Sequence, residues 1–564
     1  MGRPGFFKVL SKYFSKKLIT SKPDQIECLF IDANCFFHPE CFKIVGLYPG
    51  LIGDVLDQKL LSGIIDYLEY IIDNALPSKL VYIAIDGPAP LAKMAQQRMR
   101  RFRSVRDSLE VAQLRENYGQ QPATRWSNAC ISPGTPFMNK IKQKLQHYIS
   151  DPEVLAKWRA KCGQELEFIF DGPDTAGEGE HKLLQYIKKN LVMEGVMEND
   201  IIIYGLDADL FFLSLASKRK RIYLMRELQK FDPTVKVDDY QAIGFCSIDF
   251  VHDAIITLFN KLCPLLEIES EDAKSSIIQD FIFLCYLLGN DFIPGLPSID
   301  IYNYGIEQLI KVYGNLQLIS PGQLIQLDSI AKIVDINMDF FKLLLQNLSK
   351  DEAHYLNAIH RSFHRNRKSG YLPSNLEHQE SFEKAMMNRE NLRFYIRDNI
   401  NLGVGSPTEY RERYYKAYFS SFTRLSIICQ SYLDALRWIA SYYFLELPAW
   451  DYHYPFSHAP LVTDFSRFLD LGRFIETSFN LESTAYDPDL QLLIIMPKEL
   501  KFLVPKKYHS VFYKLHRLYP DPFGYDIDLL YKSKHWQGIP MLPGLCPDKI
   551  KKEYDLKKNE GNRV

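Results

Sequence analysis

The sequence has no CxxC pair among its ten cysteines, and many of these cysteines lie within apolar runs, such as Cys28 in ECLFID and Cys285 in FLCYLL. That usage is typical of reduced, buried thiols and excludes a disulfide scaffold. The N-terminal stretch MGRPGFFKVLSKYF lacks the apolar core of a signal peptide, and Phe6 stands where N-myristoylation requires Ser or Thr. No apolar stretch reaches the roughly 18–20 residues of a membrane span. We therefore expect a soluble, intracellular protein without a membrane partner.

The sequence also lacks an excess of either charge, since 68 basic and 69 acidic residues leave a formal net charge of −1. Proteins that bind nucleic acid usually carry a basic surplus. Such binding therefore requires that basic residues cluster locally, with acidic residues concentrated elsewhere. The length of 564 residues, 46% of them hydrophobic, suffices for a large core and for more than one lobe.

Apolar runs that end in an acidic residue recur in the first part of the chain, as CLFID at 28–32, LVYIAID at 80–86 and IIIYGLD at 201–207. Helical patterns such as LLSGIIDYLEYIIDNAL lie between them, which predicts an α/β domain with a largely parallel sheet. The composition of the chain then changes near residue 365 and again near residue 409. We expect the basic tail KIKKEYDLKKNEGNRV to be a solvated end. The predicted divisions are a first domain over 1–364, a linker or surface excursion over 365–408, and a second region over 409–564.

Acidic residues stand where ligands bind in open α/β sheets, beyond the carboxyl ends of the strands. A single Asp at a strand end is usually a turn former or a helix cap. Convergence of several is different, because two carboxylates ~6 Å apart repel by roughly 3 kcal/mol at an effective dielectric of about 20. Such a cluster requires bound cations, and its oxygen ligands select Mg²⁺ or Mn²⁺. Many enzymes that hydrolyse phosphodiesters use two such ions. The candidates are Asp32, Asp86, Glu178, Glu180, Asp207, Asp209 and Asp291.

A basic helix is predicted after Pro90, in LAKMAQQRMRRFRSVRDSLEVAQ. Lys93, Gln97, Arg100 and Arg101 follow a spacing of i, i+4, i+7 and i+8, which places them on one helical face. A solvated basic face is the simpler interpretation. However, residues 91–105 offer almost no acidic partner at i±4, and the helix begins a few residues after Asp86. Arg98, Arg103 and Arg106 add charge around this face, which suits recognition of phosphate oxygens.

At these residues the chain resembles a known family. MGRPGFF, LFIDAN, AIDGPAPLAKMAQQRMRRFRS, ISPGTPFM, GEGEHK, YGLDADL and DFIFLCYLLGNDFIPGLPSID are similar, in order and spacing, to the signature blocks of Xrn 5′→3′ exoribonucleases. SYLDALRWIASYYFLELPAWDYHYPFSHAP and KHWQGIPMLP resemble that family's second conserved region. The resemblance implies a PIN/FEN-like α/β core with a largely parallel sheet flanked by helices, and a second, mostly helical region that closes the active site.

The resemblance also implies roles for individual residues. The seven acids match the family's metal site for two Mg²⁺ ions, for which Mn²⁺ can substitute, and none of the seven is missing. Lys93, Gln97, Arg100 and Arg101 match its 5′-phosphate pocket. Asn34 and His38 match DxNxxxH, in which the histidine stacks on a nucleotide. The companion tryptophan is assigned to Trp450 in LPAWDYHYP, with Trp438 as second choice because RWIASYY has the pattern of a core helix.

The predicted activity is processive degradation of single-stranded 5′-monophosphate RNA to mononucleotides, as part of RNA decay, in the cytoplasm or else in the nucleus. The chain ends soon after WQGIPMLP, so we expect a minimal form without the family's long C-terminal extension. One alternative is a flap-type DNA nuclease of the same superfamily, which PAWDYHYP and the lack of a helix-hairpin motif after Asp291 disfavour. The other is a non-catalytic RNA-binding scaffold, which would lack a metal ligand. His181, Trp126 and Trp536 are assigned structural roles.

Overall fold

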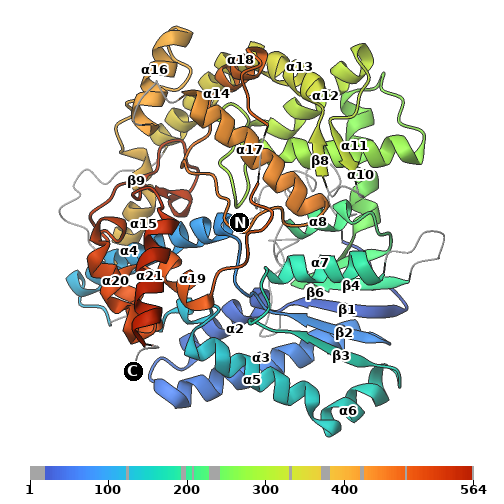
Figure 1. Cartoon of the computed structure of the whole chain (residues 1–564), viewed down its shortest axis with the longest axis vertical. Coiled ribbons are helices and arrows are strands. Elements are labelled where there is room, and N and C mark those ends of the chain that lie inside the picture. The colour runs from blue at the N-terminus through green and yellow to red at the C-terminus, as the bar shows by residue number, and fades with distance from the viewer. Residues whose placement is uncertain are drawn as a thin grey trace.

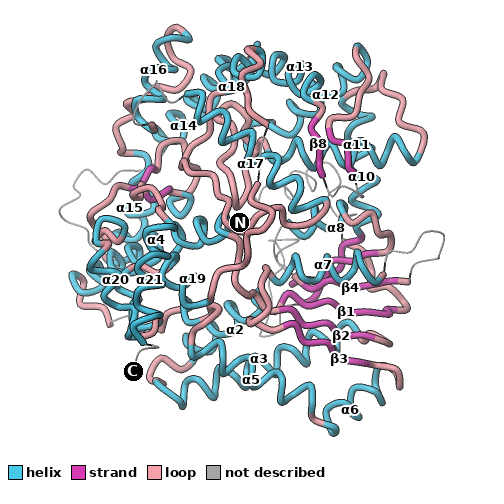
Figure 2. The backbone as a smooth tube through the Cα atoms, viewed as in Figure 1, coloured by secondary structure: helices cyan, strands magenta, loops and turns pink. Residues whose placement is uncertain are grey.

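The structure is a computed structural model, which describes residues 19–121, 126–191, 199–205, 209–227, 242–328, 333–369, 381–419, 425–476 and 479–561. One side of the molecule is built around a β-sheet, and helices make up most of the other side (Figure 1). Loops gather between the two sides (Figure 2). Among the described helices, none combines the length and the apolar character needed to cross a membrane.

The central sheet has six strands in the order β3-β2-β1-β4-β5-β6, and only β6 runs antiparallel to its neighbour. This arrangement confirms the largely parallel α/β sheet predicted from the sequence. Its strands are β1 (Ile26–Asp32), β2 (Leu80–Ala84), β3 (Glu167–Asp171), β4 (Asp200–Tyr204), β5 (Ile222–Glu227) and β6 (Ile243–Ser247). Two short antiparallel pairings among the described residues lie outside this sheet. One joins β7 (Ile325–Asp328) with β8 (Ile333–Ile336), and the other joins β9 (Ile527–Asp528) with β10 (Ile539–Pro540).

The strands are nearly continuous apolar runs, and the side chains of successive residues alternate between the two faces of the sheet. Both faces are therefore apolar. In β1, Leu29 and Ile31 point to a core shared with helices that include α2 (Asn34–Leu47), α3 (Gly53–Ala75), α5 (Pro136–Ser150) and α6 (Pro152–Cys162). Cys28 and Phe30 point to the opposite core. Figure 1 shows α3, α5 and α6 on one side of the strands and α7 (Gly179–Asn190) on the other.

The core on the α7 side continues into the helical half of the molecule without interruption. It includes residues of α17 (Leu425–Phe444), which is buried along most of its length and crosses the molecule in Figure 1. The other helices that contribute are α8 (Asp209–Ala216), α10 (Ile248–Leu262), α11 (Glu271–Tyr286), α12 (Gly305–Ile319), α13 (Met338–Lys350) and α18 (Val462–Asp470). A shared core of this kind fixes the helical half against the sheet.

The predicted basic helix is α4 (Leu91–Asn117), and its apolar side forms a third core with the end of the chain. The partners are α19 (Pro488–Ile495), α20 (His509–Lys514) and α21 (Pro547–Gly561). The expectation of a solvated basic tail is therefore wrong for the described part of α21. Ile550 and Tyr554, four residues apart, are buried on one face of this helix, while its lysines remain largely exposed.

The segment predicted as a linker or excursion, 365–408, is described only in part, because residues 370–380 lie outside the described ranges. Around that gap are the end of α14 (Glu352–Ser369), the helix α15 (Phe382–Asn391) and the start of α16 (Pro407–Tyr418). Arg389 of α15 makes ion pairs with Asp107 and Glu110 of α4, which ties this segment to the basic helix. The domain division at 364 stays a prediction.

Candidate active site

The acidic site begins at the carboxyl ends of two neighbouring parallel strands. Asp32 is the last residue of β1 and Asp86 follows β2 by two residues, and the register pairs Asp32 with Ala84. Asn34 joins the two strand ends, because its Nδ2 donates to Asp86 Oδ2 at 3.0 Å and its Oδ1 accepts from the Asp86 amide at 3.2 Å. This pair of hydrogen bonds fixes the orientation of Asp86 and gives Asn34 a positioning function in the structure.

A tight turn before α7 brings two glutamates to the same place. The Gly179 amide donates to Asp86 Oδ1 at 2.7 Å, at the positive end of the α7 dipole. A Cβ atom added at Gly179 would lie 2.7 Å from Asp32 Oδ1, so a larger residue here would displace that carboxylate. Glu178 and Glu180, on either side of this glycine, are both buried. The turn therefore carries two carboxylates to the strand-end aspartates.

Lys93 of α4 links this turn to the loop that follows α11. Its Nζ lies 2.5 Å from Glu178 Oε2 and 2.9 Å from Asp291 Oδ2. Burial acts to raise the pKa of Glu178, but the Lys93 ammonium holds that pKa below its usual value. The pKa of Asp86 is raised, by burial first and also by the Glu178 carboxylate. Lys93, Glu178 and Asp86 are therefore close enough for the charge of one group to shift the pKa of another.

The remaining acid that the structure describes, Asp209, is buried at the start of α8. It borders a small cavity together with Tyr286, Tyr443 and residues 289–290, which precede Asp291. After burial, the charges of Asp209 and Glu180 are the next contributions that raise the pKa of Tyr443. The structure therefore brings six of the seven predicted acids together, and the seventh, Asp207, lies outside the described residues.

The donor set fits hard divalent cations. Five of these six carboxylates are buried, and only Lys93 among the described cationic side chains pairs directly with them. Oxygen ligands of this type select Mg²⁺ or Mn²⁺, and buried carboxylates at such a density repel one another until cations bind. The ligand atoms are more widely spaced than in a single compact site, since no three of these acids in the described chain bring ligand atoms within 4.8 Å of one another. When bound, divalent metal ions activate water and stabilise the leaving oxygen of a phosphodiester.

The predicted phosphate face of α4 is divided in the structure. Lys93 contacts the acids, whereas Arg100 is exposed. Arg101 is half-buried, and its Nη2 donates to Ser132 Oγ at 2.6 Å. Burial lowers the pKa of Arg101 to about 10, with a further contribution from the neighbouring Arg100 charge. An anion bound here would relieve that repulsion, and Ser132 is a contact of this face that the sequence analysis did not assign.

The other arginines of α4 do not belong to this face. Arg98 is buried and donates to the carbonyl oxygens of Ile494 and Leu518, close to the Tyr519 ring. Arg103 pairs with Asp107 one turn on, and Arg106 pairs with Glu110. The expectation that these three arginines add charge around the phosphate face is therefore wrong. They hold the C-terminal part of the chain against α4.

Of the predicted stacking residues, Trp450 lies near the start of the basic helix. Its carbonyl accepts from the Leu91 amide at 2.8 Å, two residues before Lys93, and its side chain is half-buried. Trp438 is fully buried and donates from Nε1 to the Ala449 carbonyl, so it is a core residue. His38 lies on α2, one turn after Asn34, and is half-buried.

Tyr442 of α17 is a site residue that the sequence analysis missed. Its hydroxyl donates to Glu178 Oε1 at 3.1 Å, and its ring stacks on His181 with centroids 3.7 Å apart. Burial lowers the pKa of His181 to about 3, so this imidazole is neutral at pH 7. Tyr442 and His181 therefore orient the glutamate turn, as groups behind metal ligands commonly do. The pairing was invisible in the sequence because 264 residues separate Tyr442 from Glu178.

We predict that Tyr442→Phe weakens the binding of catalytic metal. Loss of a hydrogen bond to a ligating carboxylate typically costs about 10–100-fold in metal affinity or activity. The Mg²⁺ concentration for half-maximal RNA hydrolysis is therefore expected to rise by about tenfold, as measured by titrating Mg²⁺ at saturating RNA. Tyr452→Phe is the control, because the Tyr452 hydroxyl donates to the Ser431 carbonyl and not to an acid. Identical Mg²⁺ curves for wild type and Tyr442→Phe would show that this contact does not support the site.

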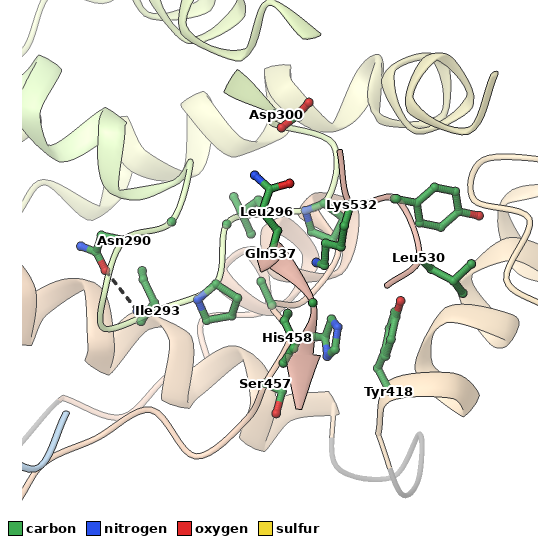
Figure 3. A pocket seen from close by; sticks show the side chains of 18 of the residues that line it. Asn290, Ile293, Leu296, Asp300, Tyr418, Ser457, His458, Leu530, Lys532 and Gln537 are labelled. Atoms are coloured by element: carbon green, nitrogen blue, oxygen red, sulfur yellow. Dashed lines mark hydrogen bonds between the residues drawn. The ribbon is translucent and has the colours of Figure 1, made fainter. Parts of the chain in front are cut away.

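A cavity of about 700 Å³ lies beside α4 and adjoins the site. Arg100 and Asp291 are among its lining residues, so it opens onto both the cationic face and the acids. Figure 3 shows side chains from the 290–300 loop, Ser457 and His458, and Leu530 and Lys532 around it. Trp536, which was assigned a structural role, is 48% exposed and also lines this cavity.

Comparison with protein families gives two matches that together span most of the chain. The model of the XRN 5′-3′ exonuclease N-terminus matches residues 1–228. The model of the Xrn1 helical domain matches 272–393 and 352–555, and so accounts for half of the chain. The chain belongs to the Xrn family. The second match begins at 272, inside the predicted first domain, which agrees with the core that the sheet shares with the helices.

Curated Xrn relatives align with nearly the whole chain. The chain is 26% identical to 5′-3′ exoribonuclease 2 of Gallus gallus, over 96% of this chain and 68% of the relative. It is 24% identical to 5′-3′ exoribonuclease 1 of Schizosaccharomyces pombe, over 100% of this chain and 50% of the relative. For human 5′-3′ exoribonuclease 1 the identity is 26%, over 100% of this chain and 35% of the relative. The chain thus spans only about a third to two thirds of the length of these proteins.

Membership of the Xrn family supports a 5′→3′ exoribonuclease and does not favour the flap-type nuclease or the non-catalytic scaffold. Xrn nucleases are generally metal-dependent, in agreement with the chemistry of the acidic site. The sequence identities of 24–26% mean that residue roles rest on the site itself.

Proposed function

We propose that this chain degrades single-stranded RNA from a 5′-monophosphate end, processively and to mononucleotides, by hydrolysis that depends on two Mg²⁺ ions. The acids at the strand ends bind the metal ions, and Mn²⁺ can replace Mg²⁺. Gln97, Arg100 and Arg101 bind the 5′-phosphate together with Lys93. The RNA is expected to be a substrate of cytoplasmic RNA decay.

The observation that carries this proposal is the direct contact between the basic helix and the acids. Lys93 belongs to the predicted phosphate face and lies within 2.9 Å of both Glu178 and Asp291. A phosphate held further along this face of α4 would therefore leave the next phosphodiester close to the acids. That geometry favours release of one nucleotide in each cycle over cleavage within the strand.

The closed structure around α4 supports an end-specific enzyme. The N-terminal half of the helix has buried residues on its apolar side and contacts Trp450, Ser132 and the C-terminal part of the chain. A duplex or an internal segment of a folded RNA requires an open groove. The 5′ end of a single strand requires only a narrow channel, and the cavity beside Arg100 and Asp291 provides space next to the acids.

The choice of RNA over DNA is tested on matched single strands. Each carries a 5′-monophosphate and the same base sequence, with ribose or deoxyribose as the only difference. We expect RNA to be hydrolysed and DNA to be degraded much more slowly. Preferential hydrolysis of DNA, or of a 5′-flap on duplex DNA, would contradict the proposal and favour the flap-type alternative.

We propose that Trp450 and His38 stack on successive bases and do not distinguish one base from another. Base–aromatic stacking contributes ~1–3 kcal/mol per base and tolerates any sequence. We therefore predict that Trp450→Ala reduces processivity and slows hydrolysis of all RNA sequences alike, measured as the length distribution of intermediates under single-turnover conditions with a competitor trap. Trp126→Ala is the control, because Trp126 packs edge-on against Phe42. Unchanged processivity in Trp450→Ala would remove Trp450 from this role.

A further inference from the structure

A second group of metal-ligand side chains lies away from the nuclease acids, in the helical half of the chain. His360 and His364 lie one turn apart on α14, in the sequence HRSFH, and Asp398 lies on the loop after α15. Their ligand atoms are all within 4.8 Å of one another, and they form the only such group of three that the described residues contain. Two histidines at i and i+4 present both rings on one helical face, a common arrangement for zinc ligands.

Both imidazoles point at one oxygen. His364 Nε2 lies 3.0 Å from Asp398 Oδ2, and His360 Nδ1 lies 3.3 Å from the same atom. The ligand atoms around tetrahedral zinc are separated by about 3.3 Å, as follows from zinc–ligand bonds of about 2.0–2.1 Å. The two histidine–carboxylate separations therefore match those around a single ion, and all three ligand atoms lie within 4.8 Å of one another.

Hydrogen bonds alone account poorly for this arrangement. Asp398 Oδ2 also accepts from the Tyr531 hydroxyl at 2.6 Å, so three groups converge on this one oxygen. His360 Nδ1 is buried, and its distance of 3.3 Å from Asp398 Oδ2 is long for a hydrogen bond between such groups. Burial, and then the neighbouring His364, lower the pKa of His360, which favours the neutral imidazole that binds metals. A cation between the three groups would satisfy that nitrogen and Asp398 Oδ2 together.

The Asp398 carboxylate also accepts hydrogen bonds from groups outside the cluster, as metal-ligating carboxylates usually do. Asp398 Oδ1 accepts from the amides of Ile400 and Asn401 at 3.0 and 2.8 Å. The Tyr531 hydroxyl accepts from the Leu402 amide at 2.9 Å, so its own proton is directed to Asp398. Arg413 of α16 donates to the carbonyl oxygens of the same loop. The loop, the helix α14 and the segment around Tyr531 therefore meet at this point.

We propose that His360, His364 and Asp398 form a second metal site, for Zn²⁺ or a similar transition-metal ion, with Tyr531 orienting the carboxylate. Imidazole and carboxylate ligands suit zinc, and a water molecule completes the four-coordinate shell. The site is structural, because it joins three segments far apart in the sequence. Neighbours of each segment, including Phe363, Leu402 and Leu530, line the cavity beside the active site, so the ion would fix one wall of that cavity.

The test uses the full chain, stripped of metal with a chelator and then given Zn²⁺ in the presence of excess Mg²⁺, which occupies the nuclease acids. We expect one zinc per chain after gel filtration, with a dissociation constant on the order of 1 µM or lower. His360→Gln and His364→Gln each weaken zinc binding at least tenfold, and Tyr531→Phe weakens it by about 10–100-fold. His354→Gln, on the exposed side of the same helix, is the matched control and binds zinc normally.

Two further measurements do not depend on RNA hydrolysis. Co²⁺ added to the stripped wild-type chain is expected to give the visible absorption of a histidine-ligated site, which His364→Gln loses. Zn²⁺ is expected to raise the melting temperature of the wild type and of His354→Gln by several degrees, but not that of His364→Gln. Absence of zinc binding by the wild type, or equal binding by the wild type and a His360→Gln/His364→Gln double variant, would overturn the proposal and leave a hydrogen-bonded His–Asp–Tyr group.

Discussion

Replacing Asp209 with asparagine is expected to reduce Mg²⁺-dependent RNA hydrolysis by on the order of 100-fold or more. A bound metal ion stabilises charge in the transition state by several kcal/mol, and each 1.36 kcal/mol corresponds to a factor of ten in rate. Asp209 is buried at the start of α8, beside the loop that carries Asp291. The same loss is predicted for Asp207→Asn, although Asp207 lies outside the described residues.

The folded state is expected to tolerate this change. Removal of one negative charge relieves repulsion among the buried carboxylates, so the free energy of unfolding without metal should be unchanged or increased. Asp339→Asn is the control, since Asp339 is also in the first turn of a helix but is exposed. Initial rates in Mg²⁺ and urea unfolding curves in a chelator measure the two effects. Near-normal hydrolysis by both Asp207→Asn and Asp209→Asn would contradict the metal assignment.

The second large effect concerns the chemistry of the RNA 5′ end. Arg100 and Arg101 are adjacent cations, and Arg101 is fixed by its hydrogen bond to Ser132. A 5′-hydroxyl would leave the half-buried Arg101 guanidinium without an anion, at a cost of about 1–3 kcal/mol or a preference of roughly 10–100-fold for the monophosphate. We predict that a triphosphate or a cap is excluded by its size, as the resemblance to Xrn nucleases implies. We therefore expect monophosphate RNA to be degraded far faster than hydroxyl, triphosphate or capped RNA.

Arg101→Ala is expected to lose most of this preference together with most of the activity. Arg115→Ala is the matched control, because Arg115 lies on the same helix and donates to the Gln121 carbonyl, away from the acids. Rates on four RNAs that differ only at the 5′ end measure both quantities. If the wild type degrades all four at the same rate, or cuts a circular RNA as fast as a linear one, α4 does not sense the 5′ end.

Local sequence patterns predicted the sheet and indicated the acids that lie at its edge, because each depends on neighbouring residues. Apolar runs such as Leu80–Ala84 form strands wherever both faces of a sheet are covered. A parallel sheet brings its carboxyl ends to one edge, so Asp32 and Asp86 had to meet. The spacing of Lys93, Gln97 and Arg101 likewise follows from helical geometry alone.

Contacts between distant segments could not be predicted in this way. Arg98 and Arg101 look alike in the sequence, yet one holds carbonyl groups of the C-terminal segment and the other faces Ser132. The buried face of α21 was overlooked because its lysines dominate the composition, while Ile550 and Tyr554 find their partners on α19 and its neighbours. Tyr442 and the His360–His364–Asp398 group depend on the same long-range packing.

The central claim is that the chain removes nucleotides one at a time from a 5′-monophosphate end, and one measurement tests it directly. The same single-stranded RNA, labelled at its 5′ end or at its 3′ end, is incubated with the chain and Mg²⁺. We expect the 5′ label to appear at once as a mononucleotide, while the 3′ label passes from full-length RNA to the shortest products without abundant intermediates. Mononucleotides released first from the 3′ label, or internal fragments from either label, would contradict the account.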